Sequence, residues 1–225
     1  MEAHMEIIDK ALSGGRSVLS EYESKQVLAR YGVPVTTEML IKNEQELCLA
    51  IERIPFPIVL KGCSPDLSHK TEKNLVILDI RTREAAVEAF REISAKIGPD
   101  DAVLVQEMVN GARELVAGMT RDAQFGPCVM FGLGGVFTEA LKDVCFRMAP
   151  LSQRDAYEMM EDIRGHKILG PVRGMPEANR EELAEVLVTV GRIGLENSSI
   201  KEIDINPLIL RDGRPVAVDA LIVLG

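Results

Sequence analysis

The stretch KEIDINPLILRDGRPVAVDALIVL, from Lys201 to Leu224, carries polar residues where a core strand would be apolar. Glu202, Asp204 and Asn206 are spaced two residues apart, so on a strand their side chains leave by the same face. The isoleucines between them point to the other face. Two alternatives follow: an edge strand with a solvated acidic face, or a cluster of hard oxygen donors that binds a cation.

The same stretch contains a strong hairpin signal. Asp212-Gly213 between two apolar runs is typical of a two-residue turn with positive φ at both positions. In that register Asn206 falls directly across from Asp219. An amide oxygen and a carboxylate that face each other can bind one Mg²⁺ ion, which substrate phosphates bind at the same time. Pro207 falls at a hydrogen-bonding position where it has no N–H to donate, so a bulge there would shift the pairing.

Composition limits the classes of function. The 225-residue chain has 46% hydrophobic and 27% charged residues and a net charge of −9. No apolar run approaches the roughly 20 residues that span a bilayer, and the N-terminus lacks a signal-peptide profile, so we expect a cytoplasmic protein with no membrane partner. The acidic balance argues against nucleic acid as the main partner. Four widely separated cysteines without a CxxC pair argue against a zinc site or a disulfide framework.

Capping and strand patterns indicate two α+β lobes. Asn43 with Glu46 and, further on, Thr82 have the spacing of residues that begin helices. The first half reads strand, helix, strand, strand, helix, strand, which is typical of a split βαβ arrangement. We expect residues 1–110 to form an N-terminal helix and the first lobe, and residues 111–225 to form the second. Small ligands commonly bind in the cleft between two lobes.

Two residues of the first lobe are candidates for phosphate chemistry. Lys61 lies at the end of an apolar strand, where its ammonium is suited to binding nucleotide phosphates; the alternative is a lysine that extends from a strand end into solvent. His69 follows in a polar loop, within the sequence SHKT. An imidazole beside a triphosphate can accept a phosphoryl group on nitrogen, whereas most loop histidines are only solvated.

A predicted strand ends with the segment QEMV where the two lobes would join. The backbone N–H and C=O groups of Gln106, Glu107, Met108 and Val109 could meet an adenine edge; otherwise Glu107 is an exposed strand residue. Glu114 begins the next strand and faces either the cleft or solvent. The residues alone leave these alternatives open.

A GLGG segment follows the strand expected at residues 127–131. Gly132, Gly134 and Gly135 have no Cβ, so their N–H groups can approach an oxyanion closely; a tight turn is the alternative. The spacing matches neither a P-loop nor the dinucleotide-binding GxGxxG pattern. Arg147, between apolar residues in CFRMAPL, favours a bound anion or a buried acid as its partner rather than free solvent.

Five segments in this order resemble the ATP-grasp subunit of the NDP-forming acyl-CoA synthetases, in particular the β subunit of ADP-forming acetyl-CoA synthetase, a relative of succinyl-CoA synthetase. They are LSEYESKQVLARYGVP (19–34), VLKGCSPDLSHKT (59–71), LVQEMV (104–109), FGPCVMFGLGGVFTEALKDVCFRMAPL (125–151) and EIDINPL (202–208). The resemblance covers nearly the whole chain and implies an ATP-grasp fold with a nucleotide cleft between two α+β lobes. It departs after HKT, where EKNLV replaces the usual acid, apolar residue and glycine pair.

The resemblance also implies roles for the candidates, with ATP or ADP and Mg²⁺ as cofactors. The implied set is Lys61 at the phosphates; Gln106, Glu107, Met108, Val109 and Glu114 around the nucleotide; Gly132, Gly134, Gly135 and Arg147 at the phosphate loop; Asn206 and Asp219 as metal ligands; Glu202 and Asp204 as supporting acids; and His69 as a catalytic phosphoryl carrier.

The implied reaction of this ligase family is acyl-CoA + ADP + phosphate = acid + ATP + CoA, with the phosphoryl group passing through a histidine of a CoA-binding α subunit. Activity is therefore expected only with that partner, in an α2β2 heterotetramer. Two alternatives stay open. One is a stand-alone ATP-grasp carboxylate ligase, and the other is a regulatory nucleotide-binding subunit without turnover, which the altered segment after His69 motivates. The acyl group and the choice between ADP and GDP cannot be read from the sequence.

Overall fold

The computed structural model describes residues 2–64, 75–135, 142–172 and 174–225. The chain divides into two compact units. Unit 1 comprises Met1–Leu19, Glu23–Val35 and Val109–Gly225, and unit 2 comprises Ser20–Tyr22 and Thr36–Met108. Each unit contains helices and a sheet, which confirms the expected α+β class.

Unit 2 is built on a four-stranded antiparallel sheet with the order β1-β4-β2-β3. Its elements along the chain are β1 (Glu38–Ile41), α3 (Glu44–Arg53), β2 (Ile58–Cys63), β3 (Val76–Ile80), α4 (Arg83–Ser94) and β4 (Ala102–Glu107). This order is the predicted split βαβ pattern. The predicted caps are present as well, because Asn43 accepts a hydrogen bond from Glu46 N and Thr82 accepts one from Ala85 N.

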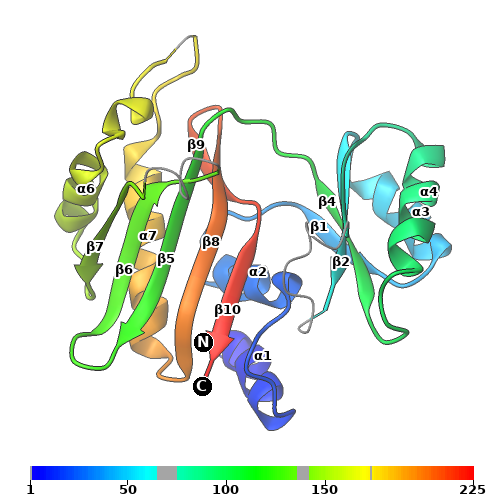
Figure 1. The fold of residues 1–225 in the computed structure, drawn as a ribbon, viewed down its shortest axis with the longest axis horizontal. Coiled ribbons are helices and arrows are strands. Elements are labelled where there is room, and N and C mark those ends of the chain that lie inside the picture. The colour runs from blue at the N-terminus through cyan, green and yellow to red at the C-terminus, as the bar shows by residue number, and fades with distance from the viewer. Residues whose placement is uncertain (1, 65–74, 136–141, 173) are drawn as a thin grey trace. The chain divides into compact units, whose positions relative to one another are not determined.

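The two helices of unit 2 cover one face of its sheet, as Figure 1 shows. Apolar residues of α3 and α4 form a core with strand residues such as Ile58, Leu60, Val103 and Val105. Since successive strand residues point to opposite faces, the residues between these, including Lys61, belong to the face that the helices leave uncovered.

Unit 1 contains a six-stranded sheet with the order β10-β8-β5-β6-β7, in which β9 also pairs with β8. The strands are β5 (Glu114–Asp122), β6 (Gly126–Leu133), β7 (Val144–Met148), β8 (Ile200–Arg211), β9 (Arg214–Ala217) and β10 (Ala220–Leu224). The helices are α1 (Glu2–Ser13), α2 (Glu21–Arg30), α6 (Gln153–Asp162), the 3₁₀ helix η1 (His166–Leu169) and α7 (Arg180–Glu196).

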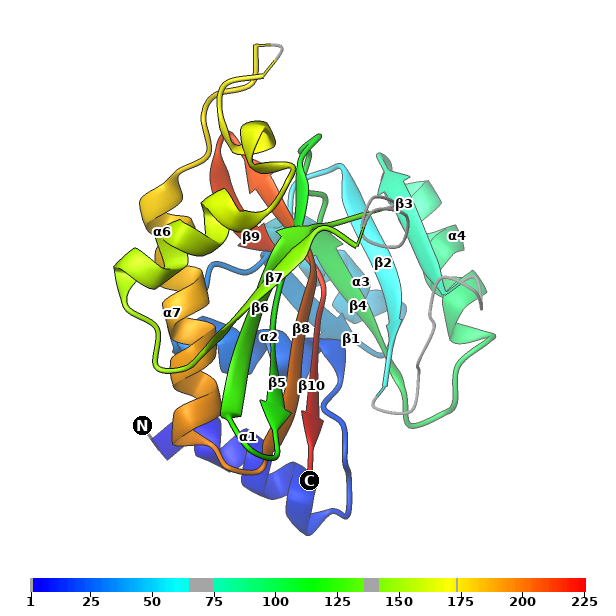
Figure 2. The same ribbon diagram turned by 60° about the vertical axis from the view of Figure 1, so that its left-hand side comes forward.

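One face of this sheet carries the core of unit 1. Buried residues of α1, α2, α6 and α7 pack in one cluster with alternate strand residues such as Ala117, Val129, Phe131 and Ile203. Figure 2 shows α7 running along this face. The intervening residues, Asp204 among them, therefore point away from the helices.

The N-terminal region lies in a different unit from the one we expected. We assigned residues 1–110 to the first lobe, but α1 and most of α2 belong to unit 1. Of residues 1–35, only Ser20–Tyr22 belong to unit 2. The reason is hydrophobic packing: Ile8, Leu19, Val27 and Leu28 are buried in the core of unit 1. The third segment of unit 1 begins at Val109, two residues before the predicted start of the second lobe at residue 111. Among the described helices, none is both long and apolar enough to cross a bilayer.

Candidate functional site

Lys61 is held in a buried ion pair within unit 2. Its Nζ donates to Glu21 Oε1 at 2.7 Å, and the two side chains are only 6% and 1% exposed. The alternative of a lysine extending into solvent is therefore wrong. An ammonium and a carboxylate both lose hydration when they are buried, so each depends on its charged partner.

One further polar residue, Gln106, shares with Lys61 the face of the unit 2 sheet opposite α3 and α4. Lys61 is opposite Leu104, and the next residue on the same face of that strand, Gln106, is fully buried opposite Val59. The sheet register therefore places two of the predicted nucleotide-binding residues on one face. Glu21 was not singled out from the sequence, because its place in the first turn of a helix indicated only a helix start.

Hydrogen bonds from Glu107 and Met108 connect the segment after Gln106 to other residues of unit 2. Glu107 and Thr37 exchange two bonds, since Glu107 N donates to Thr37 O at 2.9 Å and Thr37 N donates to Glu107 Oε1 at 2.8 Å. Met108 N donates to Pro57 O at 3.1 Å. The N–H groups of Glu107 and Met108 thus already have acceptors, so an adenine edge would meet other groups of this segment. Val109 is buried in a small apolar cluster of unit 1.

Close backbone packing accounts for two glycines of the GLGG segment. A Cβ on Gly134 would lie 2.7 Å from Leu115 O, and one on Gly132 would lie 2.4 Å from a carbonyl oxygen just before β7. Gly134 N donates to Glu114 O at 2.8 Å, so this N–H is not directed at an anion. Gly135 has a φ of 64°, and a Cβ there would lie 2.4 Å from Glu114 Oε2. Glu114 itself is exposed.

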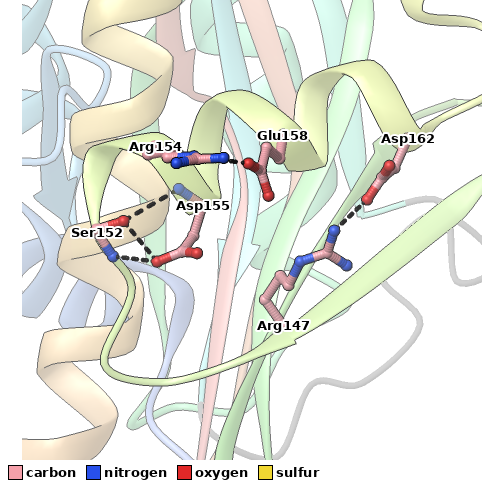
Figure 3. Close-up of polar contacts among 6 residues, drawn as sticks. All are labelled: Arg147, Ser152, Arg154, Asp155, Glu158 and Asp162. Carbon is pink, nitrogen blue, oxygen red and sulfur yellow. Dashed lines mark hydrogen bonds and ion pairs between the residues drawn. The ribbon is translucent and has the colours of Figure 1, made fainter.

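Arg147 does not join the acidic residues of the hairpin. It lies across from Val129, a core residue, and therefore on the face of the sheet that the helices cover. Its guanidinium pairs with Asp162 at the end of α6, as Figure 3 shows. The partner is an acid, but not the buried acid or bound anion that we expected, because the Asp162 side chain is 45% exposed. The strand pattern could not show which face the helix covers.

Figure 3 also shows the start of helix α6, at the end opposite this pair. Ser152 and Asp155 form a capping box, in which the serine hydroxyl accepts from Asp155 N and the aspartate accepts from Ser152 N. This capping box satisfies N–H groups that the first turn of a helix leaves without intrahelical partners. It fixes the start of the helix whose other end carries Asp162.

A buried arginine that the sequence did not reveal fixes the segment that leads into α7. Arg113 is 2% exposed and donates to the carbonyl oxygens of Ile168, Gly170 and Pro176. Burial lowers the pKa of this guanidinium. Its position, directly before Glu114 at the start of β5, gave no sign of these distant partners.

The hairpin has the predicted register. Asp212 and Gly213 adopt φ values of 52° and 84° at the turn. The pairing runs from the turn to Ile205 opposite Ala220 without the bulge that Pro207 could have introduced. Asn206 and Asp219 are opposite each other, with Asn206 N donating to Asp219 O at 3.2 Å. This confirms the predicted pairing of the two oxygen-bearing residues.

Asp204 has the most perturbed carboxylate of the hairpin. Burial, then the nearby charges of Glu202 and Asp219, raise its pKa from 3.8 to about 6. The folded protein therefore holds this proton between pH 3.8 and about 6, where the unfolded chain has released it. The free energy of unfolding falls as the pH rises through this window, and the full penalty is present above it.

The donor set of the hairpin fits Mg²⁺. Asn206 and Asp219 supply an amide oxygen and a carboxylate, which are hard donors. Among the described residues no group of three His, Cys, Asp or Glu side chains could hold a metal alone. Mg²⁺ commonly has one or two protein carboxylates and completes its shell with water and substrate phosphates. The site is thus suited to a metal that arrives with a nucleotide. His69 lies outside the described residues.

Comparison with known proteins identifies the family. An ATP-grasp domain model matches residues 10–224. The β subunit of ADP-forming acetate–CoA ligase I from Pyrococcus furiosus is 43% identical over 97% of both chains. The chain belongs to the ATP-grasp β subunits of the ADP-forming acetate–CoA ligases.

Solved structures and longer relatives agree with this membership. A structure of dinucleotide-forming acetyl-coenzyme A synthetase 1 from Ca. Korarchaeum cryptofilum, with coenzyme A and Ca-AMPCP, has a TM-score of 0.93 and 41% identity, and covers 98% of this chain and 99% of that one. Acetate–CoA ligase I of Archaeoglobus fulgidus is 39% identical over 98% of this chain, which matches only 33% of its length. The ATP-grasp β subunit thus corresponds to one part of a longer ligase, which implies an α partner.

Proposed function

We propose that this chain is the nucleotide-binding β subunit of an ADP-forming acyl-CoA synthetase. Its part of the reaction is the transfer of a phosphoryl group between a phosphohistidine and ADP or ATP, within acyl-CoA + ADP + phosphate = acid + ATP + CoA. The observation that carries this proposal is the opposed pair Asn206 and Asp219, in a chain that matches a β subunit over 97% of its length.

The residues of the two units have separate tasks in this proposal. Lys61 binds phosphate oxygens of the nucleotide, and Gln106 lies on the same face of the sheet. Asn206 and Asp219 hold Mg²⁺, with Glu202 and Asp204 as supporting acids. When bound, Mg²⁺ supplies positive charge that offsets the negative charge of the closely spaced phosphate oxygens. Glu21 keeps the Lys61 ammonium oriented, and we propose that the phosphates share or replace this carboxylate when the nucleotide binds.

The phosphoryl donor lies on the partner in this proposal. A relative was solved with Mg-AMPPCP and a phosphohistidine segment pointing towards the nucleotide binding site. We propose the same relation here, with a CoA-binding α subunit, an α2β2 assembly and a cytoplasmic location. His69 remains the predicted second phosphoryl carrier. In the transfer to ADP the N–P bond of phosphohistidine breaks, its electron pair stays on the ring nitrogen, and an oxygen of the β-phosphate forms the new O–P bond. A proton on the other ring nitrogen makes the released histidine neutral.

Reconstitution tests the proposal. The chain is co-expressed with a CoA-binding partner, and ATP formation is followed from acetyl-CoA, ADP and phosphate. We expect turnover in the wild type, a loss of at least 100-fold in Asp219→Asn, and no change in Arg154→Ala, which removes an exposed ion pair with Glu158. A His69→Asn variant with wild-type turnover would remove His69 from the mechanism. A complex that binds ADP but forms no ATP contradicts the proposal and favours a regulatory subunit.

A further inference from the structure

A fully buried lysine lies behind the metal-binding hairpin. Lys25, in helix α2, is 0% exposed and is among the largest fully buried side chains in the described part of the chain. Burying an ammonium costs several kcal/mol unless hydrogen bonds and charges compensate it. An apolar side chain of similar length would pack there without this penalty, so packing alone does not explain a lysine at this position.

Lys25 makes a hydrogen bond at the position in the hairpin where Pro207 cannot donate one to the opposite strand. Val218 N donates to Pro207 O at 3.0 Å, so these two residues are paired. Proline has no N–H with which to return the bond. Lys25 Nζ donates to Val218 O at 3.2 Å. The ammonium therefore supplies to this carbonyl the donor that Pro207 lacks.

This point of the hairpin is also where the oxygen donors lie. Asn206 directly precedes Pro207, and Asp219 directly follows Val218. The named strands stop at Ala217 and resume at Ala220, so Asp219 lies between them. In this gap the Asn206 N to Asp219 O bond is longer than the Val218 N to Pro207 O bond, at 3.2 Å against 3.0 Å. A donor that fixes Val218 thus acts on the residue adjacent to a metal ligand.

Helix α2 is itself fixed against the hairpin. Ser24 Oγ accepts from Ile222 N at 3.1 Å, and Leu19 N, just before the helix, donates to Ile222 O at 3.0 Å. Ile222 belongs to β10, the strand that follows Asp219. Lys25 is therefore presented by a rigid element, as a residue that orients a ligand requires.

We propose that Lys25 is a positioning residue for the Mg²⁺ site, which keeps Asp219 opposite Asn206 by replacing the missing N–H of Pro207. The inference rests on the proposed role of Asn206 and Asp219 as metal ligands. Loss of a residue that orients a metal ligand typically lowers metal affinity by about 10–100-fold. We expect Lys25→Met to weaken metal binding by at least about 10-fold, within that range.

The test measures metal binding and backbone protection in the full-length chain. Binding of Mn²⁺, as a probe for Mg²⁺, is followed by electron paramagnetic resonance at saturating ADP. Hydrogen exchange reports the amides of Asn206 and Val218. Lys25→Met should weaken Mn²⁺ binding and speed exchange at both amides, and Lys25→Arg should recover part of each. Val27→Ala, in a fully buried residue of the same helix, is the matched control: it should lower Tm and leave Mn²⁺ binding unchanged.

The outcomes separate this inference from the proposed function. If wild-type protein binds ADP but no Mn²⁺, the metal site itself is refuted, and the role of Lys25 with it. If the wild type binds Mn²⁺ and Lys25→Met binds it equally well, the role of Lys25 alone is refuted. Equal losses in Lys25→Met and Val27→Ala would show that general destabilisation is the cause. Should Lys25→Met not fold, Lys25→Leu, which also removes the donor, replaces it in the same comparison.

Discussion

The Glu21–Lys61 pair should show a large energetic coupling. Its Nζ–Oε1 distance is 2.7 Å and both side chains are almost fully buried. Removing one partner of a buried pair leaves the other charge uncompensated, which typically costs about 3–5 kcal/mol. We therefore expect Glu21→Gln and Lys61→Met each to lower the free energy of unfolding by about 3 kcal/mol. The double variant should lose much less than the two single losses combined, because it removes both charges of the pair together.

Urea unfolding followed by circular dichroism measures all four proteins of this cycle. The pair Glu44–Arg91, also in unit 2 but with side chains 45% and 67% exposed, is the matched control. Its cycle should show no measurable coupling, because water screens exposed pairs. Additive losses for Glu21→Gln and Lys61→Met, within about 0.5 kcal/mol, would refute the reasoning that the two charges depend on each other.

Three further predictions concern unit 1. In EDTA at pH 7.5, Asp204→Asn should raise the free energy of unfolding by about 3 kcal/mol, because about 1.4 kcal/mol accompanies each pKa unit between 3.8 and about 6. The gain should vanish below pH 4, and a gain that does not depend on pH would contradict the raised pKa of Asp204. Gly134→Ala should cost at least about 2 kcal/mol in thermal unfolding, because its Cβ would clash with Leu115 O; wild-type Tm would show that the backbone can relax. Arg113→Met should speed hydrogen exchange at the amides of Ile168 and Gly170, because Arg113 binds the carbonyl oxygens of these residues and of Pro176; unchanged exchange would show that other contacts fix this segment.

The hairpin was predictable because its determinants are local. The turn chemistry of Asp212-Gly213 and strict alternation along the strand fix the register. These two features were enough to oppose Asn206 and Asp219. The helix caps at Asn43 and Thr82 were predictable for the same reason, since each depends on residues three positions apart.

The partners of the buried charges were not predictable in this way. Lys25 bonds to a residue 193 positions away, and Glu21 to one 40 positions away. A sequence read alone shows both only as polar residues of an amphipathic helix. The prediction for Arg147 was wrong for a related reason: alternation shows which residues share a face, but not which face a later helix will cover. The N-terminal helices were assigned to the wrong unit because hydrophobic packing, not chain order, decides where a helix docks.

The bond between Leu19 and Ile222 joins the segment just before helix α2 to strand β10. During synthesis, the first helices leave the ribosome long before strand β10 exists. The Lys25 ammonium can bind the Val218 carbonyl only after this later segment has been made. Unit 1 therefore completes its folding only after β10 has been translated. A nascent chain arrested before that strand should be a substrate for chaperones.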